Sequence, residues 1–207
     1  MTDMMVMSQS VFELALVIHI AGALILFGAY AVDLFETLSL RLARSAGQVR
    51  FMLGISRYLP IVFHTAAGMI IVSGFYMGYQ DWSHQETIGW IVVALVLFLA
   101  IGLYGAKSAQ RTTVVIEEAL RASGNKMTQE LRWAIRRPEP VRQLGFSTFS
   151  VIGILVVMIF QPSVAVSILV LALAIIFGVT AAQLLIGRSR NTKSASLPEV
   201  DEPADMA

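Results

Sequence analysis

The 207-residue sequence contains no cysteine. This absence excludes disulfides, thiolate metal sites, iron–sulfur clusters, covalently attached haem and cysteine nucleophiles. Charge is also scarce, because 14% of the residues are charged and 57% are hydrophobic, whereas a soluble domain carries about 25% charged residues. A soluble chain of this length has too little interior for so much apolar surface, but a bilayer accepts it directly. The formal net charge of +1 gives no reason to expect nucleic acid as a partner.

Long apolar runs are what the sequence does contain. A helix needs roughly 20 mainly apolar residues to cross the hydrocarbon core, and five segments meet this requirement. The expected helices cover about 12–36, 58–79, 89–109, 144–161 and 163–187. The sequence therefore predicts an all-α integral membrane bundle of five transmembrane helices.

These helices are expected to form a single transmembrane domain over residues 1–187. The last two are separated only by Gln161-Pro162-Ser163, so we expect a tight hairpin there. Residues 188–207 are polar with two prolines, and this composition predicts a disordered cytoplasmic tail.

The lysines and arginines predict the orientation. All 15 lie in the segments 41–57, 107–142 and 188–193, which fall on one side of a five-helix arrangement. Basic residues in short loops stay in the cytoplasm, so we expect the N-terminus outside and the C-terminus inside. A four- or six-helix arrangement would scatter these charges over both faces. The expected location is a cell membrane of the inner or plasma type, with the lipid bilayer as partner.

The cytoplasmic loop 107–143 has structure of its own. The third helix is expected to continue into it, residues 123–125 to form a turn, and Thr128 to cap a short helix that ends before Pro138. This short helix carries an apolar stripe formed by Leu131, Ala134 and Ile135. We expect the stripe to lie on the inner membrane surface.

Two histidines lie within the predicted spans, where ionisable side chains are costly and usually functional. Both are expected to point inward on stripes of small residues. The face of His19 also carries Ala15, Gly22, Ala23, Leu26, Ala29 and Asp33. The face of His64 also carries Pro60, Ala67, Gly68, Ile71, Phe75 and Gly78. Each histidine is a candidate cofactor ligand, and the alternative for each is a structural hydrogen bond.

The depths of the two histidines differ. At 1.5 Å per residue, His19 lies about 8 Å from the outer edge and His64 about 8 Å from the inner edge, roughly 10–15 Å apart in depth. One haem held by this pair alone is therefore not expected. Asp33 and Glu36 are the carboxylates nearest in depth to His64. They are candidate proton or ion-pair partners, or solvated groups at the helix exit.

Softer donors lie on the outer side. His84 falls in the outer loop and Met77 near the outer end of the second helix. Further methionines on that side are Met4, Met5, Met7 and Met158. Thioethers suit cuprous copper, so His84 and Met77 are candidate metal ligands. The alternatives are a functionally silent histidine in a hydrated loop and a methionine of the kind common in membrane spans.

The first helix carries a family resemblance. The run LALVIHIAGALILFG at residues 14–28, with its early histidine and following small residues, resembles the copper-resistance protein D-like group and the J-type protoporphyrinogen oxidases. The resemblance covers roughly residues 12–106 and implies that His19 binds haem or porphyrin. Those oxidases usually place a lysine shortly after the Gly-Trp of the third helix, where this chain has Val92, Val93 and Ala94. The resemblance therefore implies haem binding rather than protoporphyrinogen oxidation.

The functional hypothesis is an inner-membrane protein that binds haem b or another redox or metal cofactor through His19, His64 or both. One alternative is a copper-handling or small-solute transport protein. Another is a non-catalytic subunit or scaffold that packs against other membrane subunits or a second copy of itself. No motif in the sequence names a reaction, so enzymatic activity is left open.

Overall fold

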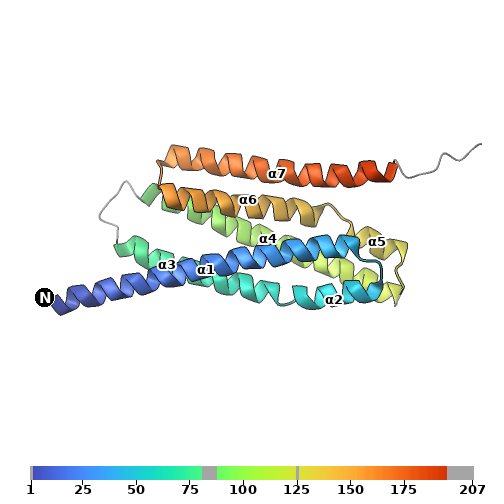
Figure 1. The fold of residues 1–207 in the computed structure, drawn as a ribbon, viewed down its shortest axis with the longest axis horizontal. Coiled ribbons are helices and arrows are strands. Elements are labelled where there is room, and N and C mark those ends of the chain that lie inside the picture. Colours follow the sequence, from blue (N-terminus) through green and yellow to red (C-terminus); the bar gives the residue numbers. More distant parts are fainter. Residues whose placement is uncertain (1, 81–87, 125, 195–207) are drawn as a thin grey trace, which may run out of the picture.

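The computed structural model describes residues 2–80, 88–124 and 126–194, and this part of the chain folds into seven helices joined by short connections (Figure 1). The helices are α1 (Thr2–Leu42), α2 (Ala46–Ser56), α3 (Leu59–Gln80), α4 (Ile88–Ser123), α5 (Gln129–Ile135), α6 (Glu139–Phe160) and α7 (Val164–Ser194). The long helices run side by side as an elongated bundle, and α2 and α5 lie together at one end of it (Figure 1).

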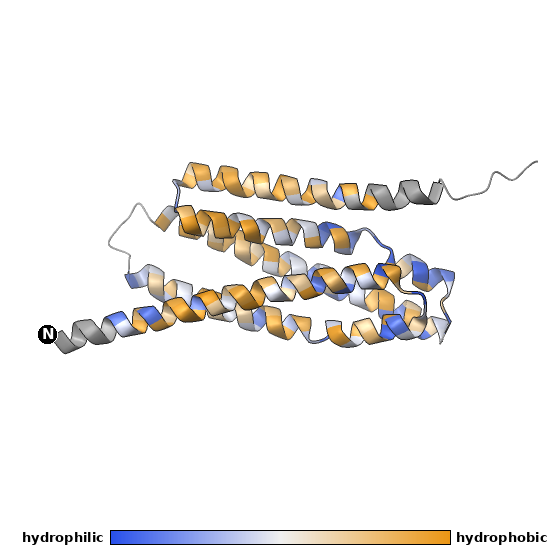
Figure 2. Ribbon diagram, in the orientation of Figure 1, coloured by the Kyte–Doolittle hydropathy of each residue, from blue (hydrophilic) through white to orange (hydrophobic). Residues whose placement is uncertain are grey.

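The predicted five-span membrane bundle is confirmed. Five helical stretches are long and apolar enough to cross a membrane: Gln9–Leu42, Ala46–Gln80, Ile88–Ser123, Gln129–Phe160 and Val164–Leu184. Apolar residues predominate along the middle of the bundle, while polar residues gather at the end that holds α2 and α5 (Figure 2). Large hydrophobic side chains such as Val72, Phe75 and Leu103 are 70–72% exposed, which is the surface that lipid covers.

The interior of the spanning region is one apolar cluster to which α1, α3, α4, α6 and α7 all contribute. Its buried members are Leu26, Ala66, Ala94, Ile101, Val151, Ile154, Val157 and Leu171. The pairs α1 with α3 and α6 with α7 make the most extensive contacts between helices. The candidate histidines of the sequence lie on the first of these pairs.

The last two spans form the expected hairpin. α6 ends at Phe160 and α7 begins at Val164, and Gln161 between them takes the left-handed conformation with φ of 44°. α7 continues to Ser194, through residues 188–194 that the sequence analysis assigned to the tail. Polar residues alone do not end a helix, and no proline lies between Pro162 and Pro198. Residues 195–207 lie outside the described part of the chain.

Glycines set how closely α6 and α7 approach. A Cβ atom built on Gly178 would lie 2.4 Å from the carbonyl oxygen of Gly145, and one on Gly145 would lie 2.6 Å from that of Gly178. Real Cβ atoms do not come this near to a backbone oxygen. The two helices therefore touch backbone to backbone, as small residues allow in membrane bundles.

The basic end of the bundle has a small core of its own. At 1.5 Å per residue α1 and α4 are about 62 and 54 Å long, well beyond the roughly 30 Å of hydrocarbon. Their ends hold α2 and α5 around a cluster formed by Leu40, Ala46, Val49, Ile116, Ala119, Leu120, Leu131, Ala134 and Ile135. The positive-inside rule predicts that this end faces the cytoplasm.

Two details of this end differ from the sequence-based expectation. The helix α2 was not predicted, although Ser45 caps it by accepting a hydrogen bond from the backbone N–H of Gln48. The helix α5 was predicted, with Thr128 as its cap. The expected place of its apolar stripe on the membrane surface is wrong, because Leu131 is fully buried in the cluster that α5 shares with α1, α2 and α4. An apolar stripe on a helix can be buried against protein as well as against lipid, and in this chain the protein buries it.

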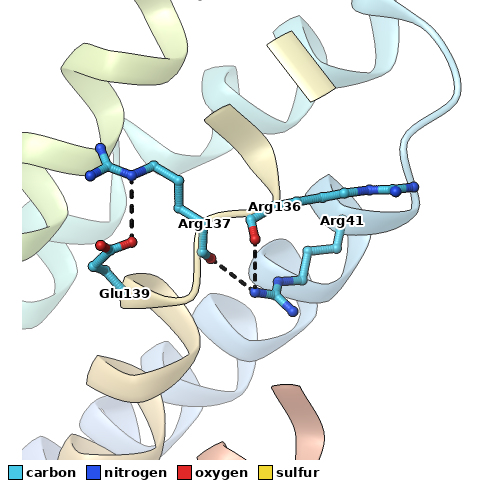
Figure 3. A network of polar contacts seen from close by, with 4 residues as sticks. All are labelled: Arg41, Arg136, Arg137 and Glu139. Atoms are coloured by element: carbon cyan, nitrogen blue, oxygen red, sulfur yellow. Dashed lines mark hydrogen bonds and ion pairs between the residues drawn. The ribbon is translucent and has the colours of Figure 1, made fainter. Parts of the chain in front are cut away.

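Arg41 ties the end of α1 to the segment that follows α5. Its guanidinium donates to the backbone carbonyl of Arg137 at 2.8 Å and to that of Arg136 at 3.4 Å (Figure 3). The side chain of Arg137 turns the other way and pairs with Glu139 at 3.4 Å. One arginine therefore links the end of α1 to the backbone of the segment between α5 and α6.

Replacing Arg41 by Ala is expected to destabilise the protein by about 1–2 kcal/mol, because hydrogen bonds from a charged donor contribute that much. Arg121 is the matched control, since its pairing with Glu117 joins two exposed side chains and such pairs contribute about 0.5 kcal/mol or less. Thermal unfolding of the purified protein in detergent measures both. Equal melting temperatures for Arg41→Ala and Arg121→Ala would contradict this role for Arg41.

Candidate functional site

His19 lies on the buried face of α1, where this helix contacts α3. Its side chain is 8% exposed, and Ala15, Leu26 and Ala29 are buried along the same face. The inward orientation predicted for His19 is therefore confirmed. Gly22 lets the helices come close, because a Cβ there would stand 3.0 Å from side-chain atoms of Met69 and Ile70.

The hydrogen bonds of His19 indicate the tautomer of its neutral ring. Nδ1 lies 3.1 Å from the carbonyl oxygen of Ile70 and 3.2 Å from Oγ of Ser73. A carbonyl oxygen only accepts, so Nδ1 carries the hydrogen. The hydroxyl of Ser73 donates to the carbonyl of Met69. The neutral ring therefore keeps its lone pair on Nε2, and this buried atom has no hydrogen-bond partner in the described part of the chain.

Gly74 provides the space for the imidazole. A Cβ atom at this position would lie 3.1 Å from Cε1 and 3.3 Å from Nδ1 of His19. The ring thus rests against the backbone of α3, with Ser73 and Ile70 holding its proton-bearing nitrogen. A side chain at position 74 would press on the ring at that nitrogen.

Replacing Gly74 by Ala is expected to shift the His19 ring and to cost about 1 kcal/mol of stability, because the ring must move against its hydrogen bonds to Ile70 and Ser73. Gly68 on the same helix is the matched control, since nothing lies within 4 Å of a Cβ built there, and Ala in place of Gly favours a helix. Thermal unfolding measures the difference. A Gly74→Ala protein as stable as Gly68→Ala would contradict the close contact.

An open apolar groove runs beside this contact. It has a volume of about 490 Å³ and lies between α1 and α3 on their outer halves. The lining residues are Val11, Leu14, Ala15, Ile18, Gly68, Met69, Val72, Ser73 and Tyr76. Ala15 and Ser73 border both the groove and His19, so an apolar molecule in the groove would lie next to the histidine.

Comparison with protein families assigns the chain to a group. A family model described as "Predicted integral membrane protein (DUF2269)" matches residues 13–162. The chain belongs to this family. The match supports a small multipass membrane protein and does not extend to the copper-resistance D-like proteins or the protoporphyrinogen oxidases. Neither the curated proteins nor the solved structures gave a match.

The second histidine of this DUF2269 protein lies elsewhere. His64 is exposed on the outward face of α3, and its Nδ1 donates to the carbonyl of Pro60 one turn earlier in the same helix, 2.5 Å away. The predicted inward orientation of His64 is wrong, because α3 turns the opposite face, with Ala66 and Ser73, toward its neighbours. His64 also precedes Ile70 by about 9 Å along the helix, so the two histidines do not share one site.

Of the two predicted metal ligands, His84 and Met77, the structure describes one. His84 lies outside the described residues. Met77 is half-buried on α3, one turn beyond Ser73 toward the outer side. Among the residues that the structure describes, no group of three or more His, Asp or Glu side chains is placed to hold a metal ion. A metal bound at His19 would therefore need other donors as well.

The two predicted carboxylates of the DUF2269 chain face the bundle instead of His64. Glu36 is 8% exposed and its Oε1 accepts a hydrogen bond from Ser56 of α2. Asp33 is half-buried one turn earlier. The suggested pairing of these carboxylates with His64 does not occur, since the histidine lies on the outward face of α3.

Sequence reasoning did not find the partners of His19. Ser73 and Gly74 were the residues missed, and the signal available for them was a Ser-Gly pair inside an apolar span. Such a pair also occurs in helices that simply pack closely. The three-dimensional contact with α1 is what distinguishes the two cases in this protein.

Proposed function

We propose that this chain is an inner-membrane protein that binds haem b, or another redox or metal cofactor, with Nε2 of His19 as the protein ligand. The observation that supports this function is the buried lone pair of Nε2 on a ring whose other nitrogen already donates to a backbone carbonyl. Histidines that bind metals almost always have this arrangement, because the carbonyl fixes the tautomer and orients the ring. An acceptor left buried without a partner costs about 1–3 kcal/mol, and ligation removes that cost.

The surroundings of His19 suit an apolar cofactor. The groove between α1 and α3 reaches Ala15 and Ser73 and offers hydroxyl groups only at Ser73 and Tyr76. Because His64 faces outward, His19 is the histidine of the described interior that would hold the haem.

The test is an absorption spectrum of the detergent-purified protein, oxidised and reduced with dithionite, with a pyridine haemochrome assay on the same sample. A stoichiometric b-type signal is the expected result. A colourless, folded protein from haem-replete cells, with no metal by elemental analysis, would overturn cofactor binding at His19.

Copper handling is a second candidate, supported by one observation. Met77 lies on the same helix as Ser73 and Gly74 and one turn further out, so a thioether lies on the helix that also contacts His19. Thioether and imidazole are ligands of cuprous copper. Elemental analysis of protein loaded with Cu(I) tests this function, and an unchanged copper content in Met77→Leu would speak against the methionine.

A role as a membrane subunit is supported by the outward face of α3. His64 is a polar group on a face that otherwise meets lipid, and such groups usually find a protein partner in membranes. Cross-linking in the native membrane, with His64→Leu as the comparison, tests whether another subunit or a second copy covers this face.

A further inference from the structure

A second polar cluster lies deeper in the bundle, toward the cytoplasmic side. Asp33 and Glu36 are three residues apart and so share one face of α1, with Cβ atoms about 5–6 Å apart. Oε1 of Glu36 accepts the Ser56 hydroxyl of α2, while its Oε2 is buried and has no hydrogen-bond partner in the described chain. One carboxylate oxygen is therefore left facing the interior.

Oxygen atoms from other turns and helices complete the cluster. Tyr30 precedes Asp33 by one turn, and its ring is held edge-on against Phe63 with centroids 5.0 Å apart. Its phenol group lies next to the Ser147 hydroxyl of α6 and within electrostatic range of Asp33. Ser147 is 2% exposed, and its Oγ makes no hydrogen bond of normal geometry within the described residues.

The unpartnered atoms point to a missing ligand. Burying a hydroxyl or carboxylate oxygen without a partner is unfavourable, and burying carboxylate charge near another carboxylate more so. Arg41, the nearest basic residue along α1, donates instead to the carbonyls of Arg136 and Arg137. Asp33 and Glu36 thus place two carboxylates and one buried, unpartnered oxygen on one face of α1, and Tyr30 lies one turn before Asp33 on the same helix.

The chemical type of these oxygen donors indicates which kind of cation they would bind. Carboxylate, phenol and hydroxyl oxygens are hard donors, and no nitrogen or sulfur donor is among these groups, which favours Na⁺, Mg²⁺ or Ca²⁺ over copper or zinc. We propose that Tyr30, Asp33, Glu36 and Ser147 bind a hard cation, which enters from the cytoplasmic side where Glu36 meets α2. This site is separate from His19 and does not depend on cofactor binding there.

Thermal unfolding of the full-length protein in detergent tests the site. Choline chloride at constant ionic strength serves as the baseline, and NaCl, MgCl₂ and CaCl₂ are titrated separately to distinguish a monovalent from a divalent ligand. One of them is expected to raise the melting temperature saturably, by about 5 °C or more at a hundredfold excess over its Kd.

Asp33→Asn and Glu36→Gln are expected to abolish this shift, while Glu117→Gln retains it, because Glu117 is an exposed carboxylate at the surface of α4. If the carboxylate variants fail to fold, Ser147→Ala keeps the proposal testable, since loss of one hydroxyl is expected to raise the half-saturating cation concentration. No specific shift with any of the three cations would overturn the site. So would a shift that survives in Asp33→Asn, or a melting temperature that responds to pH and to no cation.

Discussion

Replacing His19 by Ala is expected to remove the cofactor from the purified protein. Partners of a liganding histidine contribute about 10–100-fold to affinity, so loss of the ligand itself is expected to cost more than about a hundredfold. The measurement is haem content by pyridine haemochrome, together with metal content, both per mole of folded protein. Apart from the ligand the helix loses two hydrogen-bonding contacts, to Ile70 and Ser73, and the packing of the ring on Gly74, so the bundle is expected to assemble.

His64→Ala is the matched control for that experiment. His64 has the same side chain within the same membrane, yet it lies on the outward face of α3 and bonds only to its own helix among the described contacts. The control is expected to keep its full cofactor content. A cofactor that survives in His19→Ala and disappears in His64→Ala would overturn the assignment of the ligand. If both variants keep the cofactor equally well, neither His19 nor His64 is its ligand.

Replacing Gly178 by Ala is expected to give the largest loss of stability of any single added methyl group in the hairpin of α6 and α7. Its Cβ would stand 2.4 Å from the carbonyl oxygen of Gly145 and 2.9 Å from Cβ of Phe149. Backbone atoms cannot rotate away as a side chain can, so the helices must separate along their contact. Overpacking of this kind costs about 1–3 kcal/mol, or roughly 3–10 °C in melting temperature for a chain of this length.

Gly102→Ala provides the comparison for Gly178→Ala. Gly102 lies in the middle of α4, and nothing is within 4 Å of a Cβ built there. The same methyl group is expected to leave the melting temperature unchanged or slightly higher, because alanine favours the helix. A Gly178→Ala protein as stable as Gly102→Ala would show that α6 and α7 do not touch backbone to backbone.

The spans of this chain could be predicted because they depend on local properties. An apolar run of sufficient length must cross the bilayer wherever its neighbours lie. The orientation, which follows from the confinement of lysine and arginine to three segments, stays a prediction. The hairpin at Gln161 followed from the two residues after it, since Pro162 and Ser163 leave no length for a longer connection. The cap at Thr128 was equally local.

The helix α2 is an element that local sequence properties did not predict. Its residues 46–56 read as part of a basic connection, and the buried Val49 of this helix packs in the cluster that α2 shares with α1, α4 and α5. The apolar stripe of α5 was visible in the sequence, but the same stripe suits lipid and protein alike. Whether lipid or protein covers the stripe of α5 depends on helices that lie more than ten residues away in the sequence.

The sequence by itself determined that five helices cross the membrane, which end carries the basic residues, and that His19 and His64 lie within spans. Only the tertiary structure decided that His19 is buried with a free Nε2 and that His64 faces outward. Both histidines have small residues one turn away, so the patterns are alike; the rotation of a helix about its own axis is set by the neighbours it packs against. The same reason brings Ser147 beside Tyr30, because contacts between residues far apart in the chain depend on how whole helices pack.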